Sequence, residues 1–166
     1  MFRKRHPPVG SKPGTLVINA GAERPLIHVT KYKPEHLEEH DLAAVGDLSS
    51  LLEDNTVCWI DVQGLGDEKV LRDFAEMFSI HPLALEDVVN VPQRPKVERF
   101  EKHTLCLTRM ALLRDEQIDR EQVSIFLGSN YVLTFQERAG DVFDPVRARI
   151  RQGGPILTSH GFVSHS

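Results

Sequence analysis

The sequence predicts an α/β or α+β sandwich built on a mixed sheet. Three observations support this fold class. Segments with strand character and segments with helix character are interleaved along the chain. Compact turns join several of the strand-like segments, which indicates hairpins and therefore antiparallel pairs. Residues 57–62 (VCWIDV) are almost continuously apolar, as is typical of a central strand that is covered on both faces.

The N-terminal part of the chain predicts two strands followed by two helices. Residues 15–19 (TLVIN) and 26–32 (LIHVTKY) favour β-structure, and we expect the intervening AGAERP to form a hairpin turn. Pro34 suits the first turn of a helix over KPEHLEEHDL, and acidic residues near the start of that helix would interact favourably with its dipole. Asp47 is the expected N-cap of a second helix over DLSSLLEDN.

The segment after the apolar strand predicts a turn and an amphipathic helix. Gly64 and Gly66 lack the third glycine or the Lys-Ser/Thr ending of a nucleotide-binding loop, so we interpret VQGLGDEKV as a strand-to-helix turn. Asp67 is the expected N-cap of the helix. Apolar residues then recur at helical spacing, which predicts a core-facing stripe. These residues are Val70, Leu71, Phe74, Ala75 and Phe78.

The C-terminal half predicts a short helix, a rigid turn and further strands. Pro82 opens the helix, which we expect to run to about Val89, with His81 as a local cap or packing residue. Pro92 and Pro95 forbid continuation of the helix, and a strand-like segment follows them. Three longer strands are expected at 103–113, 120–127 and 131–137, and a last helix over FDPVRARIRQGG, with Asp144 as its cap and Pro145 at its first position.

Composition and charge limit the class of protein. The chain has 166 residues, enough for one domain with a real core, and its formal net charge of -4 argues against nucleic acid as a partner. No apolar run approaches the ~18 to 20 residues that span a bilayer, and no apolar signal segment follows the basic N-terminus. Cys58 and Cys106 lie in separate strand-like runs, which favours reduced thiols. Taken alone, the chain is predicted to be soluble and cytosolic.

Three parts of the chain are expected. Residues 1–14 are rich in proline, glycine and basic side chains, which predicts a flexible arm. Residues 15–152 form the α/β domain. Residues 153–166 begin a further, C-terminal helical region, and we interpret Ser166 as a truncation point.

Signatures of catalysis are missing from the sequence. It contains no Gly-x-Ser-x-Gly elbow and no cysteine pair at zinc-binding spacing. Its eight histidines are scattered, so a histidine-based site is not favoured. The sequence therefore predicts no catalytic residue and no organic cofactor.

Glu86 and Asp87 are the candidate site residues. In a helix that begins at Pro82 they occupy the last turn, where the dipole disfavours a carboxylate by about 0.3 to 1 kcal/mol. Two interpretations stay open: both side chains are solvated, or a cation lies beside them. Adjacent oxygen ligands select hard ions such as Mg²⁺, Ca²⁺, Mn²⁺ or Co²⁺. Arg94 and Lys96 are close in the sequence, so an intramolecular salt bridge competes with a metal ion.

Four segments, in order, resemble motifs of the CorA family of Mg²⁺/Co²⁺ transporters: WIDVQGL, IHPLALEDVVNVPQRPKVERFE, EQVSIFLGSNYVLTFQE and GDVFDPVRARIRQG. The resemblance extends from about Gly14 to Gly153. It implies a three-layer α/β/α sandwich with a mixed parallel/antiparallel sheet, on the cytoplasmic face of the cell (inner) membrane. The complete protein would be a homopentameric channel, with two transmembrane helices and a Gly-Met-Asn motif in its C-terminal part.

The resemblance also implies a role for the acidic pair. Asp87 matches a residue that helps to bind a regulatory divalent cation between neighbouring protomers, and Glu86 matches one associated with a second site. Partner ligands would come largely from a long helix of the adjacent subunit, beyond Ser166. The ion is expected to hold the closed pentamer together until intracellular Mg²⁺ falls. Asp61 and Asp141 gain no special role from the resemblance.

Two other functions remain open. A soluble α/β enzyme that uses a divalent ion to act on a small anionic metabolite would need a phosphate loop or a base–nucleophile pair, and the sequence contains neither. The second is a zinc-transporting relative of the same superfamily. The motifs favour the Mg²⁺/Co²⁺ branch, but the resemblance implies that cation choice is set in the pore, so this alternative stays open.

Overall fold

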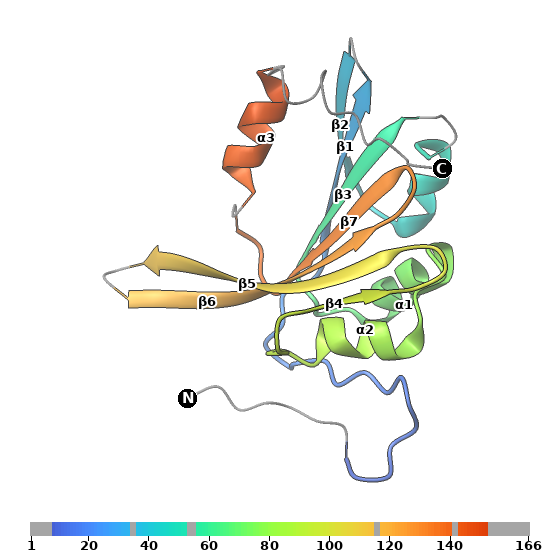
Figure 1. The fold of residues 1–166 in the computed structure, drawn as a ribbon, viewed down its shortest axis with the longest axis vertical. Helices are drawn as coiled ribbons and strands as arrows, with labels where there is room; N and C mark the ends of the chain where they lie inside the picture. Colours follow the sequence, from blue (N-terminus) through green and yellow to red (C-terminus); the bar gives the residue numbers. More distant parts are fainter. Residues whose placement is uncertain (1–7, 34–35, 53–55, 115–116, 141–142, 153–166) are drawn as a thin grey trace.

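A seven-stranded mixed sheet organises the part of the chain that the structure, a computed structural model, describes: residues 8–33, 36–52, 56–114, 117–140 and 143–152 (Figure 1). In spatial order the strands are β2-β1-β3-β7-β6-β5-β4. Their bounds are β1 Leu26–Lys33, β2 His36–Leu42, β3 Val57–Gln63, β4 Lys96–Arg99, β5 Thr104–Arg114, β6 Gln117–Leu127 and β7 Tyr131–Gln136. The helices are η1, a 3-10 helix over Val45–Ser50, and α1 Glu68–Met77, α2 Pro82–Val89 and α3 Asp144–Arg151.

The pairing directions confirm the mixed sheet that the sequence predicts. β3 runs parallel to β7, with Ile60 opposite Leu133, whereas the other neighbouring pairs are antiparallel. β3 lies between β1 and β7, and its Ile60 and Val62 are fully buried. The apolar run at 57–62 is therefore an interior strand, as its composition indicates.

Helices cover both faces of the sheet, so the three expected layers are present (Figure 1). α1 and α2 lie on the face toward which Ile60 and Val62 point. α3 lies on the opposite face, where the ring of Trp59 meets the ring of Phe143 at a centroid distance of 5.3 Å. Within the described ranges, none of the helices has the length and apolar character that a membrane crossing requires.

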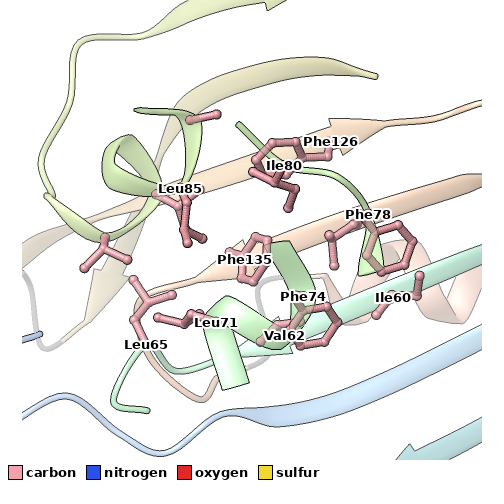
Figure 2. Packing of buried hydrophobic residues seen from close by; sticks show 14 of the residues in the cluster. Ile60, Val62, Leu65, Leu71, Phe74, Phe78, Ile80, Leu85, Phe126 and Phe135 are labelled. Carbon is pink, nitrogen blue, oxygen red and sulfur yellow. The ribbon is translucent and has the colours of Figure 1, made fainter. Parts of the chain in front are cut away.

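The apolar stripe of α1 packs into the core, as its spacing predicts. The carboxylate of Asp67 accepts the N–H of Val70 at 3.3 Å and caps the helix. Leu71 and Phe74 are fully buried. Figure 2 shows Phe74 facing Phe135 of β7, and the two rings meet edge-on with centroids 5.6 Å apart. Aromatic pairs in this geometry stabilise a core beyond the area that they bury.

The turn between β3 and α1 needs both of its glycines. Gly64 has a φ of +101°, a region that L side chains rarely adopt. A Cβ atom at Gly66 would lie 2.3 Å from the carbonyl oxygen of Ala22. The N–H of Gly66 also donates to the carbonyl of Glu23 at 2.7 Å. These glycines admit the backbone of the N-terminal segment, which confirms the interpretation of VQGLGDEKV as a strand-to-helix turn.

The predictions for the first strand and the first helix are wrong. Residues 15–19 are not a strand: Leu16 is buried and Ile18 packs against the core outside the sheet. The hairpin is formed by β1 and β2, so residues 36–42 are a strand and not the expected helix; Pro34 itself lies outside the described residues. The cause is tertiary, because β2 pairs with β1 along its whole length and its Glu39 binds Arg151 of α3.

Two helix starts also differ from the prediction. η1 begins at Val45, and the carboxylate of Asp47 accepts the N–H of Ala44 at 3.2 Å from within the helix. α3 includes Asp144, and Phe143 occupies the N-cap position. Phe143 makes no side-chain cap hydrogen bond, and its ring packs against Trp59 instead. α2, in contrast, has the predicted bounds.

Candidate functional site

α2 presents the acidic pair on its outer side. Nδ1 of His81 accepts the N–H of Leu83 at 3.2 Å, so His81 is the predicted local cap. The residues that face the core are Ala84, Leu85, Val88 and Val89. Glu86 and Asp87 lie between these positions and are partly exposed. The amphipathic pattern of the helix therefore places both carboxylates at the protein surface.

Asp87 forms a salt bridge with Lys96 at the start of β4. Nζ of Lys96 donates to Oδ2 of Asp87 at 2.6 Å and lies 3.1 Å from Oε1 of Glu98. The side chain of Asp87 is 24% exposed and that of Lys96 is 34% exposed. The intramolecular salt bridge considered from the sequence is therefore present, and Lys96 forms it; Arg94 is exposed to solvent.

The charge of Lys96 is stabilised by this contact. Partial burial lowers the pKa of Lys96, but its hydrogen bonds to Asp87 and Glu98, together with their negative charges, outweigh that effect. The net shift of the Lys96 pKa is upward. The ammonium is therefore charged at neutral pH, and it offsets the repulsion between the neighbouring carboxylates.

Glu86 binds a different part of the chain. Its Oε2 accepts a hydrogen bond from the backbone N–H of Gly14 at 3.1 Å. Its Oε1 accepts a hydrogen bond from the side-chain Nδ2 of Asn90 at 3.4 Å. Gly14 has a φ of +83°, and a Cβ atom there would lie 2.8 Å from Cβ of Pro82. The N-terminal segment thus lies tightly against α2. The two acidic side chains, adjacent in the sequence, turn toward different partners and do not converge on one point.

A surface groove of about 570 Å³ runs beside the acidic pair. Its walls are formed by His81, Leu83, Glu86, Asp87, Lys96, Glu98, Arg99 and Phe100. Carboxylate oxygens are the ligands that Mg²⁺ prefers, so Asp87 and Glu86 have the right chemistry for such an ion. Lys96 opposes a cation at Oδ2 of Asp87. Within the residues that the structure describes, no group of three or more histidine, cysteine or acidic side chains is arranged to hold a metal ion.

A second polar cluster, which sequence reasoning missed, lies between β3, β7 and α3. Asp61 is 1% exposed and Arg147 is 4% exposed, and the two form a buried ion pair. Asp61 also accepts hydrogen bonds from Oγ1 of Thr134 at 2.6 Å and Nε2 of Gln136 at 3.0 Å. The guanidinium of Arg147 lies 5.1 Å from the ring centre of Trp59. This cluster docks α3 on the sheet.

The other end of α3 is docked by a second ion pair. Arg151 donates to both carboxylate oxygens of Glu39 on β2, at 3.0 and 2.9 Å. The hydrogen bond from Arg151 lowers the pKa of Glu39, and partial burial opposes it with a smaller effect. Arg147 and Arg151 are four residues apart and lie on one face of the helix. α3 is therefore held on the sheet largely by charge.

Comparison with known proteins links the chain to one group of transporters. The family model described as "CorA-like Mg2+ transporter protein" matches residues 54–166. The cobalt/magnesium transport protein CorA of Thermotoga maritima is 40% identical over 151 residues, which are 89% of this chain and 43% of that protein. The chain thus spans less than half the length of this curated relative.

Two solved structures share the fold. The soluble domain of CorA from Methanocaldococcus jannaschii matches with a TM-score of 0.57 and 18% identity, over 85% of this chain and 49% of that chain. The ZntB cytoplasmic domain from Vibrio parahaemolyticus matches with a TM-score of 0.56 and 8% identity, over 77% of this chain and 50% of that chain. At such low identity the likeness concerns the fold alone.

Proposed function

The chain belongs to the family of CorA-like Mg²⁺ transporter proteins, and on that premise we propose that it is the regulatory, cation-sensing domain of a magnesium and cobalt transporter. The family is one of transporters and not of enzymes. The metal-dependent enzyme considered from the sequence is therefore set aside.

The position of Asp87 is the observation that carries this proposal. Asp87 belongs to the part of the chain that the family model matches, and its side chain reaches the groove beside α2. Glu86 and Glu98 add carboxylates to the same groove. Mg²⁺ takes six oxygen ligands and keeps several waters, so a site of this kind needs few protein carboxylates from each copy of the chain.

The proposed assembly is a homopentamer at the cytoplasmic face of the cell membrane. A Mg²⁺ ion at Asp87 would join one domain to acidic residues of its neighbour, and Glu86 would serve a second cation position. The ion neutralises carboxylates that otherwise repel across the contact. Because it binds the closed arrangement better, it shifts the population toward that arrangement. When Mg²⁺ falls, the domains separate and the channel admits Mg²⁺ or Co²⁺.

Domain boundaries follow from the same proposal. Residues 15–152 would form the sensing domain, and residues 1–14 a peripheral arm. Residues 153–166 would begin the helical part that leads toward the membrane.

Limited proteolysis of the complete protein tests this function. We expect Mg²⁺ in the millimolar range to protect the wild type, because the ion closes the contact between neighbouring domains. Asp87→Ala should lose this protection. Asp73→Ala is a matched control, because Asp73 forms an equally short ion pair with Lys69, 2.6 Å, on α1 and outside the groove. Co²⁺ is tested in parallel because the proposed transporter carries magnesium and cobalt. Zn²⁺ is tested as well, because a zinc transporter is the alternative considered from the sequence.

Protection of Asp87→Ala at the same Mg²⁺ concentration as the wild type would remove Asp87 from the sensing site. Protection by Zn²⁺ at concentrations where Mg²⁺ and Co²⁺ have no effect would favour the zinc-transporting relative.

A further inference from the structure

The ammonium group of Lys96 occupies the position beside Oδ2 of Asp87 that a cation bound to this oxygen would take. It is 2.6 Å from Oδ2 of Asp87 and 3.1 Å from Oε1 of Glu98, so it bridges carboxylates of α2 and β4. A Mg²⁺ ion binds carboxylate oxygen at about 2.1 Å. An ion on Oδ2 would therefore lie at most about 5 Å from this ammonium, where the two positive charges repel each other.

The backbone around Lys96 is fixed from two directions. Lys96 pairs with Leu107 in the ladder between β4 and β5. The side chain of Gln122, which is buried, accepts the N–H of Gln93 at 2.7 Å and donates to the carbonyl of Asp87 at 3.0 Å. One glutamine thus ties α2 to the segment that leads into β4. The fold itself holds Lys96 opposite Asp87.

We propose that Lys96 is a resident counter-ion at Asp87, which a divalent cation must displace, and that it thereby sets the cation concentration at which the site fills. This inference rests on the proposed function and concerns its regulation. In the cation-free protein, Lys96 offsets the repulsion between Asp87 and Glu98. The same contact weakens cation binding, because an ion on Oδ2 must separate the salt bridge and an ion on Oδ1 is still repelled by the nearby ammonium.

Mg²⁺ titration of the complete protein, followed by calorimetry or by displacement of Mn²⁺, tests this role. Lys96→Met and Lys96→Gln remove the charge, and Lys96→Arg retains it. The matched control is Lys69→Met, which breaks a salt bridge of the same length, 2.6 Å to Asp73, on α1. A partly exposed ion pair contributes at most about 1 kcal/mol, so its loss should lower the Mg²⁺ midpoint by up to about fivefold.

We expect the lower midpoint in both uncharged variants, a midpoint within about twofold of the wild type for Lys96→Arg, and no change for Lys69→Met. Thermal melting gives a second readout: Lys96→Met should gain more stability from Mg²⁺ than the wild type does, because its cation-free form has lost the counter-ion.

The outcomes separate this inference from the function on which it rests. A Lys96→Met midpoint equal to or above that of the wild type overturns the counter-ion role. If wild-type binding then still saturates and Asp87→Ala raises its Mg²⁺ midpoint or lowers the number of ions bound, the proposed sensing function stands without Lys96. If the wild type shows no saturable Mg²⁺ binding, both proposals fail.

Discussion

Replacing Arg147 with methionine isolates the contribution of the buried ion pair that docks α3. Methionine keeps most of the apolar stem of arginine but removes the guanidinium that binds Asp61. The Asp61 carboxylate would then keep only neutral donors, which are Gln63 at 2.9 Å, Thr134 at 2.6 Å and Gln136 at 3.0 Å. The stacking of the guanidinium over Trp59 would be lost as well.

The size of the effect follows from the burial of both partners. Asp61 is 1% exposed and Arg147 is 4% exposed, so water cannot screen the carboxylate that remains. Breaking a buried ion pair by removing one partner costs about 3 to 5 kcal/mol. Domains of this size have unfolding free energies of about 5 to 15 kcal/mol. We therefore expect Arg147→Met to remove a large part of the stability of the domain.

Urea unfolding followed by circular dichroism measures this loss, and a double variant tests its cause. Asp61→Asn combined with Arg147→Met leaves no unpaired charge, and the asparagine oxygen can still accept from Thr134. The double variant should therefore be more stable than Arg147→Met alone. The reasoning is wrong if Arg147→Met unfolds within about 1 kcal/mol of the wild type, or if the double variant is the less stable of the two.

Three further outcomes are expected. Phe74→Ala should lower the free energy of unfolding by about 3 to 5 kcal/mol in urea, because it leaves a cavity against Phe135; a loss below about 1 kcal/mol would contradict this. Arg151 lowers the pKa of Glu39, so this pair stabilises the fold above the unfolded-state pKa of about 4.3, and its contribution disappears as pH falls through the folded-state pKa. Arg151→Gln should therefore lower the free energy of unfolding by up to about 1 kcal/mol at neutral pH, and by almost nothing at a pH well below the folded-state pKa of Glu39. Urea unfolding at the two pH values measures this, and an equal loss at the two would contradict it. Burial raises the pKa of Glu137 in the folded protein. The fold therefore loses stability as pH rises from the unfolded-state pKa of this residue to its higher folded-state pKa. Glu137→Gln should melt at the same or a higher temperature than the wild type at neutral pH, and a lower melting temperature would count against this.

Local chemistry explains which elements could be predicted from the sequence. Asp67 and Pro82 mark helix starts through capping and a fixed φ, and these act within one turn of chain. The interior position of 57–62 follows from its apolar composition. β2 was missed because acidic residues near a proline favour a helix locally, whereas the partner that makes them a strand is β1. Pairing of this kind depends on the fold as a whole.

In the candidate site, too, contacts between residues close in the sequence could be predicted and contacts between distant residues could not. Lys96 lies nine residues from Asp87, so their salt bridge was foreseen as an alternative to a metal ion. The contact of Glu86 with Gly14 spans 72 residues and left no local signal. Asp61 and Arg147 are 86 residues apart. The one available hint was an aspartate inside an apolar strand, since a buried carboxylate requires a partner.

The position of the cation in the assembled protein tests the proposed sensing role most directly. Crystals of the complete protein with saturating Co²⁺ would locate the ion by its anomalous scattering. We predict a peak about 2.1 Å from a carboxylate oxygen of Asp87, at a contact between two copies, with the Lys96 ammonium moved away from Oδ2. Cobalt peaks elsewhere in the assembly, with none at Asp87 and its salt bridge to Lys96 intact, would contradict the role of this residue as a cation ligand.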